Sequence, residues 1–525
     1  MAQTHGNTAA SKLINAPRSR SFSGPFGRLF RELPPWEPKG DSEVAHLDSI
    51  EKIAAQMGPQ NPAANNKSIP AGYTYFGQFI DHDLTFDPRS SLQKHNDPES
   101  LEDFRSPAFD LDCIYGRGPD DQPYMYAQSG DPDFKKGMLR WDKSNVFGEP
   151  DLARIGPAFS VPTPLNLGQI SDADKSLSYL HRAVIGDKRN DENTFVSQLQ
   201  LTFIKFHNAV LDQLTDGGPN SFAEAQRLTR WHYQWVVIHD WLKRLCGAEL
   251  VDAMLCSGDC PGKPKLCYYN PHEHPFMPVE FSVAAYRLGH SMVRGRYSIN
   301  KLVGPNNNPR GLPTFDGAAD TNPLGDFRGF RPLPRAWTVD WSFMLQFKND
   351  PAQQPQLQFS SPLDKSLAQA LIAMPTAIAD PDEVPSNPPT PPTPPPNPIK
   401  RSLAYRNLLR SWRFCLPSGE AVARHMGIDI SGNPASESAE FSAHGDTPQW
   451  RYILDEAAAA PQNGEKLGPV GSRIVAETFI GLLAADPSSY YRVHPNWTPD
   501  ARIPVVGDGF QLRDIVNFAG ARVEL

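Results

Sequence analysis

Two aspartates flank a histidine inside an otherwise apolar stretch of this chain. The stretch reads YFGQFIDHDLTFDP from Tyr75 to Pro88, and Asp81, His82 and Asp83 stand at its centre. The aromatic and aliphatic neighbours predict burial, where a polar or charged group without a partner is costly. The fold must therefore supply partners for these three side chains, or bind something that does.

A helix over this stretch would send the two acids to different places. Successive residues differ by about 100° around a helix, so Gln78 and His82 share a face one turn apart while Asp83 points away from Asp81. The two carboxylates would then have different partners. A helix-capping acid beside a core histidine explains the same residues without any function, so the stretch alone leaves both interpretations open.

A second group of acids follows in RSPAFDLDCIYG, from Arg105 to Gly116. Four potential oxygen ligands stand at every second position: Ser106, Ala108, Asp110 and Asp112. In an extended chain they project alike. Two carboxylates, a hydroxyl and a carbonyl are hard ligands of the kind that Ca²⁺ binds, and Asp83 would complete the set. The solvated edge of a strand shows the same alternation.

Helical periodicity dominates the rest of the chain. Apolar residues recur at helical spacing from Thr194 to Leu214, before Gly217, Gly218 and Pro219. The next helix opens with Ser221 and Glu224, which predict a capping box. Similar patterns are FSVAAYRLGHSMV, SLAQALIAM, RSLAYRNLLRSW and VGSRIVAETFIGLL. Strand-like alternation is sparse, so the sequence predicts a mainly α fold with long loops and little β.

Composition narrows the class of protein. The chain has 525 residues, 39% of them hydrophobic and 21% charged, which is typical of soluble globular proteins. A net charge of −8 gives no support to nucleic-acid binding, and no stretch approaches the roughly 18 apolar residues of a transmembrane segment. The N-terminal residues lack the apolar region of a secretory leader, which leaves secretion and a cytoplasmic location both open.

Prolines and cysteines are unevenly distributed. Of 53 prolines, many lie in VPSNPPTPPTPPPNP at 384–398, which predicts an exposed polyproline II segment. Four of the six cysteines lie close together: Cys246, Cys256, Cys260 and Cys267. They lack the paired C-x2-C spacing of a zinc site, so one local disulfide or plain buried thiols are expected.

The two acid-bearing stretches, GQFIDHDLTFDP and PAFDLDCIYG, resemble the animal-type haem peroxidases. That superfamily also contains cyclooxygenases and fungal fatty-acid dioxygenases. The resemblance implies that Asp81 is a haem-ester acid, His82 the distal histidine and Asp83 a calcium ligand, with Gln78 lining the distal cavity. It maps the other calcium ligands onto Ser106, Ala108 (main chain), Asp110 and Asp112. Haem b and Ca²⁺ would then be the missing partners.

The stretch IGDKRNDENTFVSQL is similar to the catalytic-arginine motif of the same family. By this match Arg189 is the distal arginine and Glu192 the second haem-ester acid. Asn193 stands where mammalian halide-oxidising members can carry a sulfonium-forming methionine, so that third link is expected to be absent. Without the resemblance, a charged turn that caps the following helix would be the simpler explanation of these residues.

Two later stretches resemble the proximal side of the family's haem site. In EFSVAAYRLGHSMVR, His290 matches the iron ligand, Gly289 allows close approach of the porphyrin and Arg287 matches a contact to a haem propionate. In RNLLRSWRFCLPSG, Asn407 matches the acceptor of the proximal N–H and Arg410 a second propionate contact. Taken singly, a core histidine and a surface helix with scattered arginines explain both stretches.

The resemblance extends from about residue 65 to the end of the chain, and it predicts the domain organisation. His290 and Asn407 must meet at one haem, so residues 41–525 are expected to form a single helical haem peroxidase domain. An irregular arm, residues 1–40, would precede it. The proline-rich segment at 384–398 is then a surface insertion and not an interdomain linker.

The implied activity is reduction of H₂O₂ with oxidation of small organic donors or halides. His82 would move the peroxide proton and Arg189 would stabilise the leaving oxygen. A fatty-acid dioxygenase of the same superfamily needs a tyrosine three residues before the proximal histidine, where this chain has Arg287 and Tyr286 lies one position earlier. A binding protein with a peroxidase fold is supported only by the KGD of Lys39–Asp41. The oligomeric state is not predicted.

Overall fold

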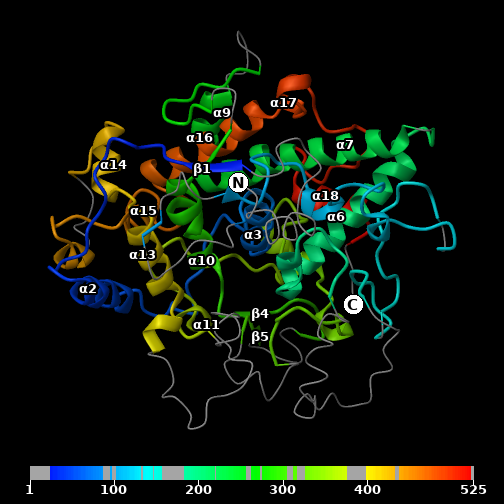
Figure 1. Cartoon of the computed structure of the whole chain (residues 1–525). Coiled ribbons are helices and arrows are strands. Elements are labelled where there is room, and N and C mark those ends of the chain that lie inside the picture. The colour runs from blue at the N-terminus through cyan, green and yellow to red at the C-terminus, as the bar shows by residue number, and fades with distance from the viewer. Residues whose placement is uncertain are drawn as a thin grey trace, which may run out of the picture.

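Helices dominate the part of the chain that the computed structural model describes, as the sequence predicts (Figure 1). The described residues are 24–86, 95–96, 102–131, 134–145, 147–155, 182–218, 220–255, 262–271, 275–303, 311–315, 325–374, 398–431 and 437–521. Strands in these ranges are short: β1 (Gly24–Gly27), β2 (Glu102–Asp103), β3 (Met277–Pro278), β4 (Arg296–Tyr297) and β5 (Leu312–Pro313). β1 pairs antiparallel with β2 and parallel with β3, while β4 pairs antiparallel with β5.

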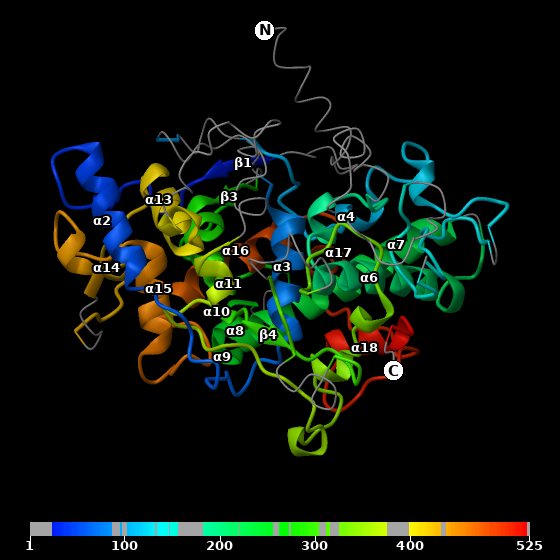
Figure 2. The same ribbon diagram turned by 90° about the horizontal axis from the view of Figure 1, so that it is seen from below.

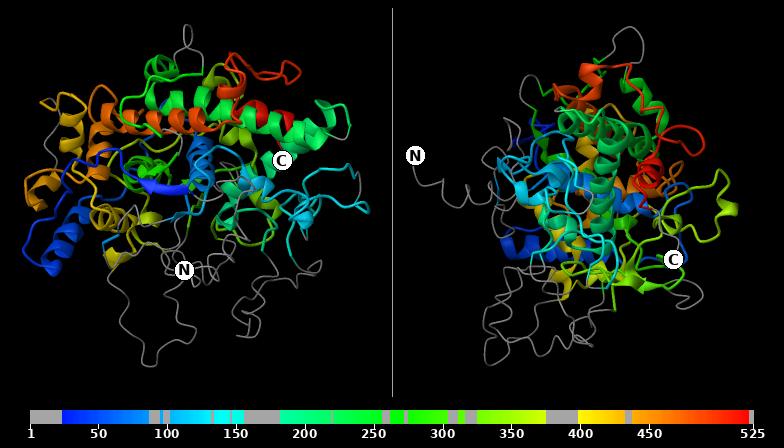
Figure 3. Two further views of the ribbon diagram at one scale, coloured as in Figure 1. Left: turned by 45° about the horizontal axis from the view of Figure 1, so that its top comes forward. Right: turned by 90° about the vertical axis from the view of Figure 1, so that its right-hand side faces the viewer.

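Helix α3 lies near the middle of the molecule, between two groups of helices (Figure 2). The first half of the chain contributes α2 (Glu43–Ala55), α3 (Gly72–Leu84), α4 (Asp112–Tyr115), α6 (Thr194–Gln213), α7 (Ser221–Val236), α8 (Lys243–Cys246) and α9 (Ala248–Leu255). The second half contributes α10 (Gly289–Met292), α11 (Gln369–Ile372), α13 (Leu403–Arg413), α14 (Gly419–His425), α15 (Gln449–Ala458), α16 (Pro469–Ala485), α17 (Tyr490–Val493) and α18 (Leu512–Phe518). The two groups in space do not follow the halves of the chain: Figure 3 shows the blue α2 together with the orange segments at one end and the green α7 at the other.

Aromatic packing holds α3 in this central place. Phe79 stacks on Phe203 of α6 with ring centroids 5.0 Å apart, and α3 also packs against α10. Gly77 lets a neighbour approach closely, because a Cβ there would lie 3.0 Å from the Trp241 ring. The helix ends where Thr85 turns extended and its hydroxyl donates to the carbonyl of Asp81. The helix expected over Tyr75–Thr85 is confirmed.

Other expected helices differ in detail. The helix predicted over Thr194–Leu214 is α6, but the capping box expected at Ser221 and Glu224 is wrong. Ser221 instead donates its hydroxyl proton to Asp216, and Glu224 pairs with an arginine of its own helix. The helix expected over SLAQALIAM is confined to the four residues of α11, because Ala368 has an extended ψ of 141°.

The segment with His290 is helical throughout but not regular. A π-helical turn at Glu280–Ala284 is followed by a 3₁₀ turn at Ala285–Leu288 and then by α10. A second π-helical turn, Val237–Leu242, joins α7 to α8. Such turns change the direction in which neighbouring side chains point, and they occur often at functional sites.

Three features of the sequence lie partly outside the described ranges. Cys113, Cys246, Cys267 and Cys415 carry free thiols, of which Cys113 and Cys246 are buried. Cys256 and Cys260 belong to undescribed ranges, as do residues 384–397 of the proline-rich segment and residues 1–23 of the arm. Among the helices that the structure describes, none combines the length and apolar character needed to cross a bilayer.

The described end of the arm is anchored to the segment that precedes His290. The main-chain N–H groups of Leu29 and Phe30 donate to the carboxylate of Glu280, which is 0% exposed. Arg28 donates to the carbonyl of Phe414 at 2.7 Å, and Trp36 is buried. The arm is therefore held by directional bonds as well as by its aromatic side chains.

Replacing Glu280 by Ala is expected to lower the free energy of unfolding by about 2 kcal/mol, because it leaves buried N–H groups without an acceptor. Urea denaturation measures this, and limited proteolysis should show earlier cleavage within residues 24–40. Glu32→Ala is the matched control, since Glu32 belongs to the same arm but its side chain is 60% exposed. Equal stability of the two variants would contradict the anchoring role.

Candidate functional site

His82 is held by a series of amide hydrogen bonds that fixes its tautomer. The carbonyl of Cys113 only accepts, so the contact at 2.8 Å must come from the Nε2 of Gln200. Oε1 of Gln200 therefore accepts from Nδ2 of Asn190 at 2.8 Å, and Oδ1 of Asn190 faces Nδ1 of His82 at 2.7 Å. Nδ1 carries the proton, and the lone pair of Nε2 is left as the proton acceptor of His82.

The surroundings keep His82 neutral. Burial lowers the pKa of His82 to about 4, and the positive charge of Arg189 contributes to the lowering. Its Nε2 lies 3.8 Å from Oε1 of Glu192. A neutral imidazole with a free Nε2 is in the form that accepts a proton near neutral pH.

The Arg189 side chain is held by the main-chain carbonyl of His82 and by the carboxylate of Asp187. It lies on a 3₁₀ turn, Lys188–Asp191, and its Nη2 donates to the carbonyl oxygen of His82 at 2.8 Å and to Oδ2 of Asp187 at 2.7 Å. The guanidinium also lies over the ring of Phe86, 4.7 Å from its centroid. These contacts hold a permanent positive charge next to the histidine.

Gln78 and Glu192 belong to the same cluster. Nε2 of Gln78 donates to Oε1 of Glu192, and Oε1 of Gln78 accepts from Asn193 at 3.1 Å. Asn193 is the N-cap of α6, since its Oδ1 accepts from the N–H groups of Phe195 and Val196. Helix capping thus orients Asn193, and Asn193 orients Gln78.

The two acids expected to form haem esters lie near each other. Burial raises the pKa of Glu192 to about 7 against the opposing charge of Arg189, and the charge of Asp81 adds to the rise. The Glu192 side chain is 35% exposed although protein surrounds it, so it borders open space. Asp81 is half-buried and its Oδ1 accepts from the hydroxyl of Thr85 at 3.1 Å.

His290 and Asn407 meet although 117 positions separate them. Nδ1 of His290, on α10, lies 2.8 Å from Nδ2 of Asn407, on α13. The sequence predicts that Asn407 accepts, but its amide nitrogen faces the ring, so Nδ1 accepts and Nε2 carries the ring proton. A half-turn of the amide exchanges its oxygen and nitrogen and reverses both roles. Burial lowers the pKa of His290 to about 3, with Arg287 as a second cause, so the ring is neutral.

The residues around His290 differ in their contacts. A Cβ built on Gly289 would meet no atom within 4 Å, so open space borders this position. Arg287 is half-buried and its Nε donates to the carbonyl of Ser282 at 2.9 Å. Arg410 follows Asn407 by one turn of α13 and is half-buried.

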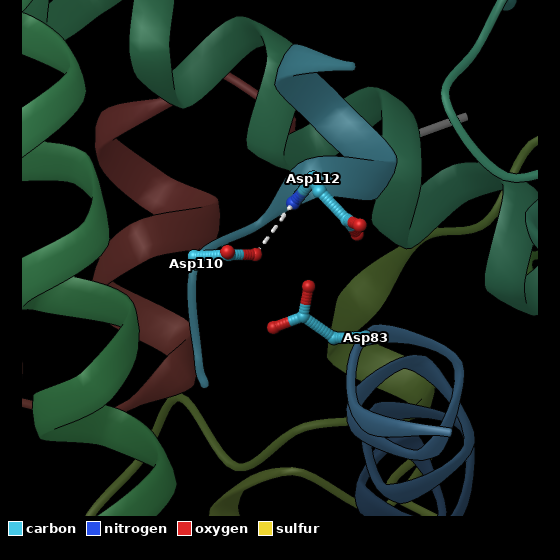
Figure 4. A group of neighbouring side chains, drawn as sticks. All are labelled: Asp83, Asp110 and Asp112. Carbon is cyan, nitrogen blue, oxygen red and sulfur yellow. Dashed lines mark hydrogen bonds between the residues drawn. The ribbon is translucent and has the colours of Figure 1, made fainter. Parts of the chain in front are cut away.

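Asp83, Asp110 and Asp112 converge in the interior (Figure 4). One oxygen from each carboxylate lies within 4.8 Å of the other two, and all three residues are buried. Both oxygens of Asp83 and Oδ1 of Asp112 have no hydrogen-bond partner among the described residues. The hydroxyl of Ser106 donates to Asp110 at 2.7 Å, and the half-buried Ala108 lies at the bend between them.

The extended conformation expected for residues 106–112 is wrong. The chain bends at Ala108, Leu111 adopts a left-handed conformation with φ of 56°, and α4 begins at Asp112. This turn folds Asp112 back, so that its N–H donates to Oδ1 of Asp110 at 3.2 Å. The oxygen ligands therefore converge through a local turn and not through strand alternation.

Electrostatics shows that the three acids need a compensating charge. Burial raises the pKa of Asp83 well above its ordinary value, and the charges of Asp110 and Asp112 add to the rise. Arg105, which is 0% exposed, compensates only in part, because it pairs with Asp112 at 2.7 Å and also with Asp187. A cation at the cluster, or protons, would remove the remaining cost.

One acid connects the two clusters. Burial alone would raise the pKa of Asp187, but Arg105 and Arg189 lower it well below its ordinary value. Asp187 therefore stays ionised and is shared by a guanidinium of each cluster. Sequence reasoning missed Asp187, Asn190 and Gln200, although an amide at a buried position of the apolar helix α6 was a usable signal for Gln200.

Comparison with protein families gives a match to the animal haem peroxidases over residues 109–337. This range includes Asp110, Asp112, Arg189, Glu192 and His290, but neither His82 nor Asn407. Among curated proteins, a peroxidase-like protein of Margaritifera margaritifera is 26% identical over 276 residues, which are 46% of this chain and 33% of that protein. A peroxidase of Drosophila melanogaster is 24% identical over 36% of this chain and 29% of its own length. The chain thus spans about a third or less of the curated relatives it matches.

Solved structures show the same fold at low sequence identity. Peroxidase A of Dictyostelium discoideum superposes with a TM-score of 0.60 at 14% identity, covering 95% of this chain and 94% of that one. A fatty acid alpha-dioxygenase of Arabidopsis thaliana superposes with a TM-score of 0.55 at 15% identity, covering 92% and 76%. The mainly helical fold is that of peroxidases and alpha-dioxygenases. The family match over residues 109–337, the related sequences and the fold thus agree in their similarity to the animal haem peroxidases.

Proposed function

We propose that this protein is a haem peroxidase that reduces H₂O₂ and oxidises small organic donors or halides. The observation that carries the proposal is the fixed tautomer of His82, which leaves Nε2 free, in a residue whose main-chain carbonyl accepts from the permanently charged Arg189. That pair supplies a proton acceptor and an electrophile in one place. Relatives named peroxidase support the class of reaction but not the donor.

The residues present fit a haem group. Open space borders Gly289 next to His290, and the Glu192 side chain is 35% exposed. Both positions therefore leave space for a bound group. In this proposal Nε2 of His290 would hold the iron, with the Asn407 amide turned so that its oxygen accepts the proton of Nδ1 and orients the ring. Asp81 and Glu192 would form the ester links, while Arg287 and Arg410 would pair with the propionates.

Bound haem supplies the iron that binds peroxide and takes up its oxidising equivalents. Nε2 of His82 accepts a proton from the peroxide and returns it to the leaving oxygen. The guanidinium of Arg189 stabilises the negative charge that develops on that oxygen. Gln78, held between Glu192 and Asn193, positions a donor N–H group at the edge of the same site.

We further propose that the cluster of buried acids binds Ca²⁺. The unpartnered oxygens of Asp83 and Asp112 support this, because a buried carboxylate without a donor is costly unless a cation meets it. The proposed ligands are Asp83, Ser106, the main chain of Ala108, Asp110 and Asp112. Ser106 would turn its hydroxyl proton away from Asp110 to bind through oxygen.

The same proposal treats residues 41–525 as one domain, with residues 1–40 as an arm and 384–398 as a surface insertion. Support comes from two contacts: α3, which carries His82, packs against α10, and His290 of α10 meets Asn407 of α13. A dioxygenase role for Tyr286 receives no comparable support, because its hydroxyl is engaged by Trp241.

The absorption spectrum of the haem-supplemented protein tests the proposed function. A ferric Soret band should change on addition of H₂O₂ and recover when a phenolic donor or iodide is added. A folded protein that binds no haem, or whose haem spectrum ignores peroxide, would contradict the proposal. Steady-state oxidation of several donors then identifies the substrate class.

Replacing Asn407 by Leu is expected to lower haem affinity or peroxidase activity about 10- to 100-fold, because it removes the partner that orients His290. Haem transfer to an excess of an acceptor protein measures the first quantity. Ser411→Ala is the control, since Ser411 lies one turn later on α13 and its hydroxyl donates to the main-chain carbonyl of Asn407 and not to His290. If both variants keep haem as wild type does, Asn407 has no role in holding the ligand.

A further inference from the structure

Three aromatic side chains lie in contact, leading away from the haem side of the site. Tyr286 precedes His290 by four residues and accepts a hydrogen bond from Nε1 of Trp241 at 3.0 Å. Trp241 stacks on Tyr73 of α3, with ring centroids 6.0 Å apart and planes 9° from parallel. Burial raises the pKa of Tyr286 well above its ordinary value, and the charge of Asp81 adds to the rise. Tyr286 is therefore close to a residue of the proposed haem site.

Two features of the backbone, a π-helical turn and a glycine, allow these rings to come together. Trp241 lies in the π-helical turn Val237–Leu242, and Gly77 of α3 leaves the room that its ring occupies. Asp240 and Trp241 are adjacent in sequence, yet both are buried and both contact Tyr73. The altered helical turn lets two neighbours face the same side chain.

Tyr73 differs from the other two rings because it has a proton acceptor. Its hydroxyl donates to Oδ2 of Asp240 at 2.5 Å. Asp240 is 3% exposed and is held by Arg244 at 2.6 Å and by the N–H of Leu512 at 3.0 Å. A phenol loses its proton when it loses an electron, so a carboxylate at hydrogen-bond distance makes Tyr73 easier to oxidise.

Tyr286 lacks such an acceptor among the residues that the structure describes. Its oxygen accepts the indole proton of Trp241, and no carboxylate lies within hydrogen-bond distance of its own hydroxyl. Trp241 likewise donates only to that phenol. An oxidising equivalent that enters at Tyr286 is thus not trapped there and is most stable on Tyr73.

We propose that Tyr286, Trp241 and Tyr73 form an internal redox chain that ends at Tyr73. The inference rests on the proposed function, which supplies the oxidant in the form of haem oxidised by H₂O₂. One electron leaves Tyr73 and reaches the haem through Trp241 and Tyr286, and the phenolic proton moves to Oδ2 of Asp240. A one-electron donor later returns the electron, the proton returns to the phenol, and the chain is restored.

The chain gives the protein a second place to hold an oxidising equivalent. Tyr73 is buried, but the Arg244 guanidinium that covers its ring is 22% exposed, with 4.7 Å between guanidinium and ring centroid. Oxidation stored at Tyr73 is thereby close to the protein surface and separated from the peroxide site. Small donors would not need to enter the haem cavity to be oxidised.

Electron paramagnetic resonance of the haem-loaded full chain, frozen shortly after mixing with H₂O₂, tests the inference. Wild type should give a tyrosyl radical whose spectrum narrows when the protein contains ring-deuterated tyrosine. Tyr73→Phe keeps the stacked ring and should lower that signal at least tenfold, as should Trp241→Phe. Tyr75→Phe is the matched control, since Tyr75 is a buried tyrosine of the same helix that stacks on Phe195 instead.

The outcomes separate the inference from the function on which it rests. An unchanged radical in Tyr73→Phe, or a haem that reacts with H₂O₂ in wild type without any protein radical, would overturn the redox chain and leave the peroxidase proposal standing. A haem whose Soret band ignores H₂O₂ would overturn both. Spin trapping followed by peptide mass spectrometry gives a second readout, with the adduct expected on the peptide that contains Tyr73.

Discussion

The His82→Gln variant is expected to react with H₂O₂ about two to four orders of magnitude more slowly than wild type, since it loses the group that moves the peroxide proton. Glutamine preserves bulk and polarity but cannot accept a proton near neutral pH. The amide relay from Cys113 through Gln200 and Asn190 makes this effect specific, because it holds the accepting nitrogen in one tautomer. Stopped-flow absorption of the haem-loaded protein at several peroxide concentrations gives the bimolecular rate constant.

Two further variants make that result interpretable. Asn190→Ala should reduce the same rate constant by a smaller factor, because His82 keeps its Nε2 but loses its fixed orientation. His425→Gln should change nothing, since His425 lies on α14 and pairs with Glu32 of the arm at 3.3 Å. A His82→Gln variant that reacts as fast as the His425 variant would show that another group moves the proton.

Calcium should raise the free energy of unfolding by about 3 to 4 kcal/mol when free Ca²⁺ exceeds its dissociation constant 100- to 1,000-fold. Asp83→Asn should abolish this gain, because Asp83 contributes the two buried oxygens that no donor satisfies. In EGTA, the free energy of unfolding of Asp83→Asn should be higher than that of wild type, because the variant no longer buries an uncompensated carboxylate. Thermal and urea unfolding with EGTA or Ca²⁺ measure both differences.

Matched controls are available for the calcium experiment. Asp429→Asn removes a carboxylate at a site where a serine main chain and hydroxyl already satisfy it, so calcium should act on it as on wild type. Magnesium at the same concentration should stabilise wild type less, since its smaller octahedral shell suits a convergent carboxylate cluster poorly. Equal stability of wild type with EGTA and with Ca²⁺ would remove calcium from the proposal.

The fold class and the central helices were predictable because burial follows apolar periodicity. The apolar face of α6 and the aromatic residues of α3 are visible in the sequence, and both helices form where expected. The family resemblance also placed His290 with Asn407 across 117 positions, which periodicity alone could not do. The prediction that His290 and Asn407 meet came from the order of the family's motifs along the chain.

Local geometry was less predictable, for physical reasons that differ from case to case. Leu111 adopts a left-handed φ that leucine rarely takes. The alternating oxygen ligands therefore wrongly predicted an extended chain from Ser106 to Asp112. Ser221 failed as a cap because Asp216 attracts its hydroxyl. The amide relay behind His82 depends on three elements meeting, and no local pattern records that.

The arginine pair on either side of Asp187 would make the acid cluster and the proposed peroxide site thermodynamically interdependent. Arg105 divides its charge between Asp112 and Asp187, and Asp187 in turn restrains Arg189. A cation that neutralises Asp112 frees Arg105 to bind Asp187 more strongly, which alters how tightly Arg189 is held. Linkage is reciprocal, so an anionic ligand that draws Arg189 away from Asp187 must change the affinity for calcium by the same factor. Calcium would then act on the position of Arg189 as well as on the stability of the fold.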